Sequence, residues 1–312
     1  MNKKYFLKFL LTIFVTALVL YFLFKGIHFS EIVKIFYFKW QIIVFTVPLF
    51  FVIKFINSLR FSRAYNTKLS KKLFYTLCYS NMMLSVFPFR LGELSYIARL
   101  QKITGEKYSE TTSKLIKIRL FDYVSIYLLL MVSSIYVYAQ FSNIIKIISV
   151  FFICSLIVGL LSLFVIIKLN LSKKIKFRKF SQILLTIENE VRGHARINYL
   201  RDLGVLLLSL LYWFVRLLMG YFVLVMLGIH LSFFTVVFIS MSVFMLTLIP
   251  IQFFAGFGIT EAGFLFFLTQ LGFEYNSTLA VLLMFHLYLL IPVVFWGCFG
   301  FFLEYLRKRQ RD

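Results

Sequence analysis

Apolar runs long enough to cross a lipid bilayer constrain this chain more than any other feature. A helix needs about 20 apolar residues to cross the hydrocarbon core of a membrane. The chain is 61% hydrophobic and only 15% charged, whereas soluble domains are about 45–50% apolar and about 25% charged. We expect an all-α polytopic membrane protein in which residues 1–312 form a single integral membrane domain. Its six predicted spans are Tyr5–Phe24, Trp40–Leu59, Leu120–Ala139, Ile144–Ile167, Leu203–Leu227 and Thr278–Leu303.

Two further apolar stretches are shorter, and each stops at a proline. The stretch 73–87 ends at Pro88, and the stretch 233–249 ends at Pro250. Proline removes a backbone donor and breaks a helix, and irregular backbone is tolerated at membrane depth only where protein or water surrounds it. Both stretches are therefore predicted to begin broken or re-entrant helical hairpins. The predicted hairpins span residues 73–99 and 233–272.

The basic residues predict the orientation of the chain in the membrane. Lys and Arg number 34 against 12 Asp and Glu, and cytoplasmic loops carry such an excess. The segments 60–72, 168–202 and 307–311 are basic, whereas 140–143 and 228–232 contain no Lys or Arg. We expect a multi-pass protein of a prokaryotic plasma membrane with both termini in the cytoplasm. Because the cations lie beside spans, their excess does not indicate nucleic acid. The cytoplasmic loop 169–202 is predicted to be a basic amphipathic helix or a solvated connector.

The densest charged group at membrane depth follows the first proline. Arg90 and Glu93 stand three positions apart beside Pro88 and Gly92. Ionisable residues inside a membrane are functional candidates because they are costly to keep there. Arg90 and Glu93 either pair with each other, which would merely stabilise the hairpin, or open to place Arg90 on a lipid phosphate, which its planar guanidinium suits.

A second group repeats this order. Pro250 is followed by Gly256, Gly258 and Glu261, as Pro88 is followed by a glycine and a glutamate. The predicted hairpins would enter the membrane from opposite faces, the first from the cytoplasm. The order therefore suggests a weak internal repeat of the kind that inverted-repeat transporters place around a midplane site.

Other ionisable residues lie within the predicted spans. Arg119 and Asp122 are neighbours on one helical face, three residues apart, either as a binding pair or as a helix-start anchor. Arg216 lies in mid-span, and we expect Glu93 or Glu261 to be its partner. Two residues receive no role in binding: Lys54 stands near a span end, from where a lysine can snorkel, and His286 is predicted to be a hydrogen-bonded interior residue.

These elements together resemble the lysylphosphatidylglycerol synthase transmembrane family, also called flippase-like or UPF0104-type proteins. The resemblance lies in a P-x-R-x-G-E element at Pro88–Glu93, an E-R-x-x-D element at Ile118–Asp122, and a Pro, Gly, Gly, Glu block at Pro250–Glu261. The chain departs from the family in two places. Ile118 stands at the Glu position of the second element, and His286 stands where the last span often carries an arginine.

The resemblance implies that this membrane domain moves lipid between leaflets. In bifunctional members, such a domain moves aminoacylated phospholipid, while a separate soluble synthase domain, which is absent from these 312 residues, attaches the amino acid. Other members are thought to serve polyprenyl-linked sugar pathways. We therefore expect a flippase-like transporter of a phospholipid or polyprenyl-linked lipid, with membrane lipids as its partners and with no nucleic acid.

Two other functions remain as alternatives. One is a membrane glycosyl- or acyl-transferase that uses a lipid-linked donor, with Glu93 or Asp122 as the base. The other is a non-transporting subunit of an envelope-synthesis complex. The sequence contains no G-x-S-x-G, H-E-x-x-H or Walker A motif, which weighs against an enzyme. We expect no cofactor and no metal, and leave open a homo-oligomer or envelope-biosynthesis partners. The predicted substrate-binding residues are Arg90, Glu93, Arg119, Asp122, Arg216 and Glu261, supported by Pro88, Gly92, Pro250, Gly256 and Gly258.

Overall fold

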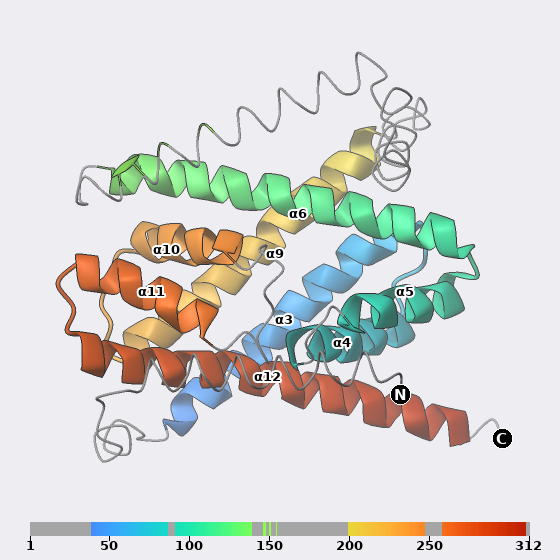
Figure 1. The fold of residues 1–312 in the computed structure, drawn as a ribbon. Helices are drawn as coiled ribbons and strands as arrows, with labels where there is room; N and C mark the ends of the chain where they lie inside the picture. Colours follow the sequence, from blue (N-terminus) through green and yellow to red (C-terminus); the bar gives the residue numbers. More distant parts are fainter. Residues whose placement is uncertain are drawn as a thin grey trace, which may run out of the picture.

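The computed structural model of the protein describes residues 39–86, 91–138, 199–246 and 258–309, together with residues 146, 147, 150 and 154. Across these ranges the regular structure is entirely α-helical (Figure 1), which confirms the expected fold class. The helices are α3 (Trp40–Tyr65), α4 (Lys71–Val86), α5 (Leu91–Thr104), α6 (Tyr108–Val137), α9 (Tyr199–Met226), α10 (Phe233–Leu246), α11 (Ile259–Gln270) and α12 (Tyr275–Arg309).

Four of these helices, α3, α6, α9 and α12, are long and apolar enough to cross a membrane. They contain 26 to 35 residues, which is at least about 39 Å of helix against a hydrocarbon core of about 30 Å. They correspond to four of the six predicted spans. The predicted span 5–24 lies outside the described residues, and only four positions of the span 144–167 lie within them.

The start of α6 differs from the sequence prediction. The helix begins at Tyr108, twelve residues before Leu120, where the apolar run starts. Its first turns are polar on one side, but Leu115 and Ile118 on the other side are buried in a cluster with residues of α3, α4 and α5. This packing stabilises a helix that hydropathy alone places only from Leu120 onward.

Two pairs of short helices occupy the places of the predicted hairpins. In the first helix pair α4 packs against α5, and in the second helix pair α10 packs against α11. The four helices have 12 to 16 residues, or about 18–24 Å, so none of them alone reaches across a core of about 30 Å. The connecting residues 87–90 and 247–257, which include both prolines, lie outside the described residues.

The long helices run in opposite directions in the two halves of the chain, which we define as α3–α6 and α9–α12. Figure 1 shows α3 and α9 side by side and antiparallel, with α6 and α12 also running in opposite directions. The first helix pair starts and ends where α3 ends and α6 begins. The second pair starts and ends at the opposite end of the bundle, where α9 ends and α12 begins.

The helix contacts repeat between the halves. At the centre α3 packs on α9. The contact of α4 with α12 corresponds to that of α10 with α6. The contact of α6 with α9 corresponds to that of α12 with α3. The ends of corresponding helices also match, because Gly105 after α5 and Gly272 after α11 both have positive φ, 71° and 89°. An approximate two-fold rotation therefore relates the halves, and because it reverses the helix directions it makes an inverted repeat.

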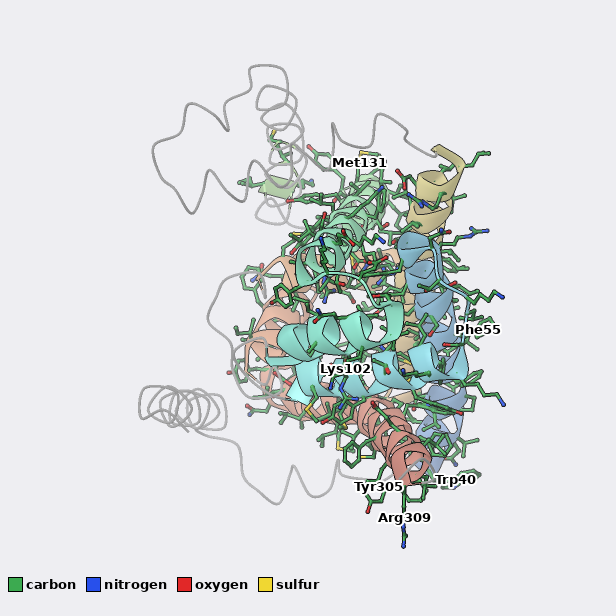
Figure 2. The ribbon with its side chains drawn as sticks, turned by 90° about the vertical axis from the view of Figure 1, so that its right-hand side faces the viewer. Trp40, Phe55, Lys102, Met131, Tyr305 and Arg309 are labelled. Atoms are coloured by element: carbon green, nitrogen blue, oxygen red, sulfur yellow. The ribbon has the colours of Figure 1, made fainter. Side chains whose placement is uncertain are left out.

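The outer surface of the bundle is rich in large apolar side chains. Trp40, Phe55 and Tyr305 are 60%, 42% and 57% exposed, and Figure 2 shows them projecting from the bundle. Apolar surface of this extent is unusual for a protein in water and is typical of a surface that contacts lipid. The interior is occupied by one large cluster shared by α3, α6 and α9–α12, and by a smaller one among α3–α6.

Candidate functional site

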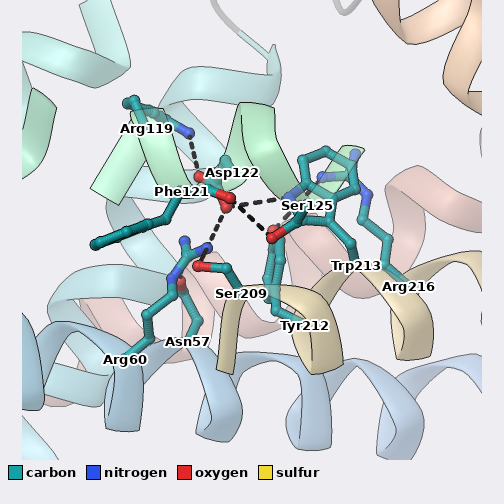
Figure 3. Close-up of polar contacts among 10 residues, drawn as sticks. All are labelled: Asn57, Arg60, Arg119, Phe121, Asp122, Ser125, Ser209, Tyr212, Trp213 and Arg216. Carbon is teal, nitrogen blue, oxygen red and sulfur yellow. Dashed lines mark hydrogen bonds and ion pairs between the residues drawn. The ribbon is translucent and has the colours of Figure 1, made fainter. Parts of the chain in front are cut away.

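The main polar group of the described residues lies where α3 crosses α9 and α6 packs beside both (Figure 3). Arg60 on α3 is buried, and its Nη1 donates a hydrogen bond to Oδ1 of Asp122 on α6. The same nitrogen lies 3.3 Å from Oγ of Ser209 on α9. Its Nη2 donates to Oδ1 of Asn57 at 2.8 Å. One guanidinium group thus joins three helices.

Asp122 is the acceptor for several donors at once. Nε1 of Trp213 donates to its Oδ1 at 3.0 Å, and Nη1 of Arg119 lies 3.7 Å from its Oδ2. The structure therefore brings Arg119 and Asp122 within ion-pair distance and adds Arg60 as a closer partner. Two guanidinium groups around one carboxylate leave this group with net positive charge.

Arg216 extends the positive charge along α9. Its Nη1 lies 3.5 Å from the hydroxyl of Tyr212, and its guanidinium carbon lies 5.1 Å from the ring centroid of Trp213. The guanidinium carbon of Arg60 lies 4.7 Å from the Tyr212 ring centroid. The ring of Tyr212 thus stands between two arginines, as Figure 3 shows. Cations over aromatic faces are stabilised by the ring quadrupole.

Lys54 lies near the middle of α3 and does not snorkel, contrary to the sequence expectation. It is 1% exposed, and its Nζ lies 4.7 Å from the Phe50 ring centroid. The expectation failed because α3 continues beyond the apolar run to Tyr65, which places Lys54 in the helix interior, where α9 covers it. We call Lys54, Arg60, Asp122, Tyr212 and Arg216 the central cluster.

A second polar group lies at the start of α11. Glu261 is 1% exposed; it accepts a hydrogen bond from the backbone N–H of Gly258 at 2.6 Å, and its Oε1 lies 2.7 Å from Nδ1 of His286 on α12. Gly258 has φ of 97°, a conformation that favours glycine. His286 is hydrogen-bonded, as expected. The expected pairing of Arg216 with Glu261 is not found, because Glu261 turns to α12 while Arg216 contacts aromatic residues of its own helix.

The first predicted motif falls mainly outside the described residues. Pro88 and Arg90 lie outside them, as do Pro250 and Gly256 of the second motif. Gly92 and Glu93 are placed in the backbone of α5, while the side chain of Glu93 is outside the described part. Within that part, no three His, Cys, Asp or Glu residues are arranged to hold a metal ion.

Sequence reasoning missed three members of the central cluster. Arg60 was counted with the basic segment after the span, Lys54 was set aside, and Tyr212 was hidden in an apolar run. Asp122 offered a signal for Arg60, because a carboxylate inside a span requires a cation as partner. No pattern in the sequence, however, indicates which of the many cations that partner is.

Comparison with known proteins fits this architecture. The family described as "Lysylphosphatidylglycerol synthase TM region" matches residues 7–297. The chain belongs to this family. A relative is the UPF0104 membrane protein MJ1078 of Methanocaldococcus jannaschii, 28% identical over 229 residues, which cover 70% of this chain and 92% of the relative. No solved structure matches the chain.

Membership of the lysylphosphatidylglycerol synthase TM region family confirms the resemblance seen in the sequence and makes the chain a multi-pass membrane protein. The matched residues include both helix pairs and every member of the central cluster. The cluster therefore lies within the membrane region that defines the family, between its two antiparallel halves.

Proposed function

We propose that this chain moves a lipid with an anionic headgroup, a phospholipid or a polyprenyl-linked lipid, between the two leaflets of the membrane. The observation that carries the proposal is the charge of the cluster between the halves. Arg60 and Arg119 lie beside one carboxylate, Asp122. Arg216 lies next to Tyr212 and Trp213, and Lys54 is buried on α3 six residues before Arg60. An excess of cations inside a membrane protein is costly unless an anion enters among them.

The arrangement of the helices supports transport. Inverted-repeat transporters place their substrate site at the interface of the repeats and expose it alternately by rocking one half against the other. Here the central cluster lies at such an interface, between α3 and α9. In the proposed mechanism, Arg90 and Arg216 attract the headgroup, and Glu93 balances them or contacts a cationic headgroup. Glu261, which pairs with His286, is left with the second of these roles.

We further propose that the protein lies in a prokaryotic plasma membrane with both termini in the cytoplasm. The end of the bundle where α3 ends and α6 and α9 begin is basic in sequence, and the opposite turn, 228–232, has no Lys or Arg. Positive residues favour the cytoplasmic side. The first helix pair would then enter from the cytoplasm and the second from outside.

The transferase alternative draws less support from the geometry. A catalytic base must reach its substrate, yet Asp122 is buried, with Oδ1 accepting hydrogen bonds from Arg60 and Trp213 and Oδ2 facing Nη1 of Arg119 at 3.7 Å. A non-transporting subunit would have no use for a cationic cluster between its halves. For these reasons we favour transport.

Reconstitution tests the proposal directly. Purified protein is placed in liposomes that carry a fluorescent phosphatidylglycerol, phosphatidylcholine or polyprenyl phosphate, and a membrane-impermeant quencher reports the fraction of probe in the outer leaflet. We expect an anionic probe to become fully accessible to the quencher, and Arg216→Ala to slow this exchange. Lys102→Ala, which removes an exposed cation at the end of α5, is the matched control. Exchange no faster than in protein-free liposomes, for every probe, would refute the proposal.

The first motif is tested in the same assay. Arg90→Ala and Glu93→Gln should abolish exchange while leaving expression and membrane insertion near normal. Arg90→Lys should rescue only part of the activity, because an ammonium group cannot make the bidentate contact of a guanidinium with phosphate. Wild-type exchange by both of the first two variants would assign the motif a structural role.

A further inference from the structure

Lys54 is a buried cation with no carboxylate partner among the described residues. It is 1% exposed, and its described side-chain contact is with the ring of Phe50. Its neighbour Arg60, six residues later on the same helix, is by contrast paired with Asp122. A buried charge without a counter-charge destabilises a protein strongly. Function therefore accounts for Lys54 better than stability does.

The inverted repeat gives Lys54 a counterpart in the second half. Lys54 lies 17 residues before Lys71, where α4 begins, and Arg216 lies 17 residues before Phe233, where α10 begins. Because α3 and α9 pack against each other and correspond under the two-fold rotation, these two cations occupy matching positions of the two halves, with Lys54 buried and Arg216 exposed.

The hydroxyl of Tyr212 marks the place where they meet. Nη1 of Arg216 lies 3.5 Å from it. Arg60 contacts Ser209, and the Phe45 ring packs on the Phe222 ring. Because α3 and α9 are antiparallel, this register places Lys54 opposite the turn 212–216 of α9. Since Asp122 balances Arg60, the positive charge left over around Tyr212 among the described side chains belongs mainly to Lys54 and Arg216.

We propose that Lys54 and Arg216, one from each half, jointly bind the phosphate group of the transported lipid. This inference rests on the proposed function and deepens it by naming the residues and the chemical group. Lysine supplies a compact charge, arginine a planar fork of N–H donors, and the Tyr212 hydroxyl a third donor, which together suit the oxygens of a phosphate. Because the two cations sit on different halves, a bound phosphate couples the halves.

Binding to purified protein in detergent tests this without requiring transport. The thermal unfolding midpoint is measured against increasing concentrations of a short-chain phosphatidylglycerol, a short polyprenyl phosphate, inorganic phosphate and a short-chain diacylglycerol. A ligand that binds the folded state raises the midpoint in a saturable way. We expect both phosphate lipids to do so and the diacylglycerol, which lacks phosphate, to have no effect. A rise with inorganic phosphate of the same affinity would identify the free ion, and not the lipid, as the ligand and overturn the proposal.

The variants assign the binding to the two cations. Lys54→Met and Arg216→Met should each weaken the binding of the phosphate lipids about tenfold or more, the loss expected for one charged hydrogen bond. Lys54→Arg should retain most of it, and Lys102→Met, the exposed control, all of it. Unchanged affinity in either Lys54→Met or Arg216→Met would overturn the proposal. If Lys54→Met does not fold, the affinity of Arg216→Met for the phosphate lipids tests the proposal. Arg216 is exposed, so its replacement leaves no cavity in the core.

The two proposals fail in different ways. If phosphate lipids bind and the variants lose binding, while liposomes show no exchange, the phosphate site stands and transport is refuted. If liposomes show exchange that neither Lys54→Met nor Arg216→Met slows, transport stands and the joint phosphate site is refuted.

Discussion

The two halves of the protein share their helix packing but differ in the polar residues that the packing brings together. Arg60 lies 11 residues before α4 begins, and Phe222 lies 11 residues before α10 begins. Asp122 is the fifteenth residue of α6, and Leu289 is the fifteenth residue of α12. The first half thus carries a buried ion pair at positions where the second half carries two apolar residues, of which Phe222 is 39% exposed. The repeat preserves the fold, while the charge differs between the halves.

A second set of corresponding positions differs more subtly. Glu93 and Glu261 are each the third residue of the second helix in their pair. Arg119 and His286 are each the twelfth residue of the long helix that follows. Both halves therefore carry a glutamate and a nitrogen side chain at these positions, with an arginine in the first half and a histidine in the second.

The largest expected effect breaks the ion pair of the first half. Asp122→Ala leaves Arg60 buried without its carboxylate and should destabilise the protein by about 3–5 kcal/mol. Replacing both partners with apolar residues, as Arg60→Met with Asp122→Leu, should restore most of the loss, because no buried charge is then left without a partner. Denaturant unfolding in detergent measures both. A double variant less stable than Asp122→Ala alone would show that the halves are not interchangeable here.

The next effect concerns the glutamate of the second half. Glu261→Ala removes the acceptor of the Gly258 N–H and the partner of His286, and should cost about 2–3 kcal/mol. His286→Arg should be tolerated, because the corresponding position of the first half is Arg119. The unfolding midpoints of Glu261→Ala and His286→Arg, each compared with that of the unmodified protein, measure the two effects. If His286→Arg lowers the unfolding midpoint as much as Glu261→Ala does, the equivalence of positions 119 and 286 does not extend to their contribution to stability.

A smaller effect tests how closely the first helix pair approaches α12. A Cβ at Gly297 would lie 2.4 Å from Cβ of Met82 on α4, whereas a Cβ at Gly220 would lie 3.7 Å from the Phe285 ring. We expect Gly297→Ala to destabilise the protein by about 1–3 kcal/mol through overpacking, and Gly220→Ala to be neutral or slightly stabilising. Thermal unfolding of the two variants should separate them; equal stability would mean that α4 and α12 are packed less closely than described.

The smallest expected effect concerns the starts of α12 and α6. Hydrogen bonds from the Ser277 side chain and from the backbone N–H groups of Ser277 and Asn276 lower the pKa of Glu274. At the corresponding place before α6, Lys107 makes no capping bond. Because the pKa of Glu274 is lower in the folded state than in the unfolded state, its ionised carboxylate stabilises the fold at a pH above the unfolded-state pKa. This stabilisation is lost as the pH falls through the folded-state pKa. Glu274→Gln should therefore lower the unfolding midpoint slightly at neutral pH and not in acid, whereas Lys107→Gln should change it at neither pH.

The sequence predicted the features that depend on local pattern. The apolar runs located α3, α9 and α12, and the prolines with their following glycines located both helix pairs. Contacts between distant segments were not predictable in this way. Arg60, Asp122 and Trp213 meet because α3, α6 and α9 cross, and nothing in the periodicity of any one helix indicates that crossing. The same limit applies to Glu261. The sequence suggested Glu261 as a partner of Arg216, but in the structure Glu261 is hydrogen-bonded to His286.

If the halves are inverted, the two helix pairs enter the membrane from opposite sides. In a background lacking the free cysteines 78, 154 and 298, single cysteines replace the exposed residues Ser70 and Lys107, which flank the first pair, and His230 and Asn276, which flank the second. An impermeant thiol reagent is then added outside intact cells. We expect labelling at 230 and 276, and labelling at 70 and 107 only after permeabilisation. Labelling of all four positions from one side, or of only one position within either pair, would contradict this inversion.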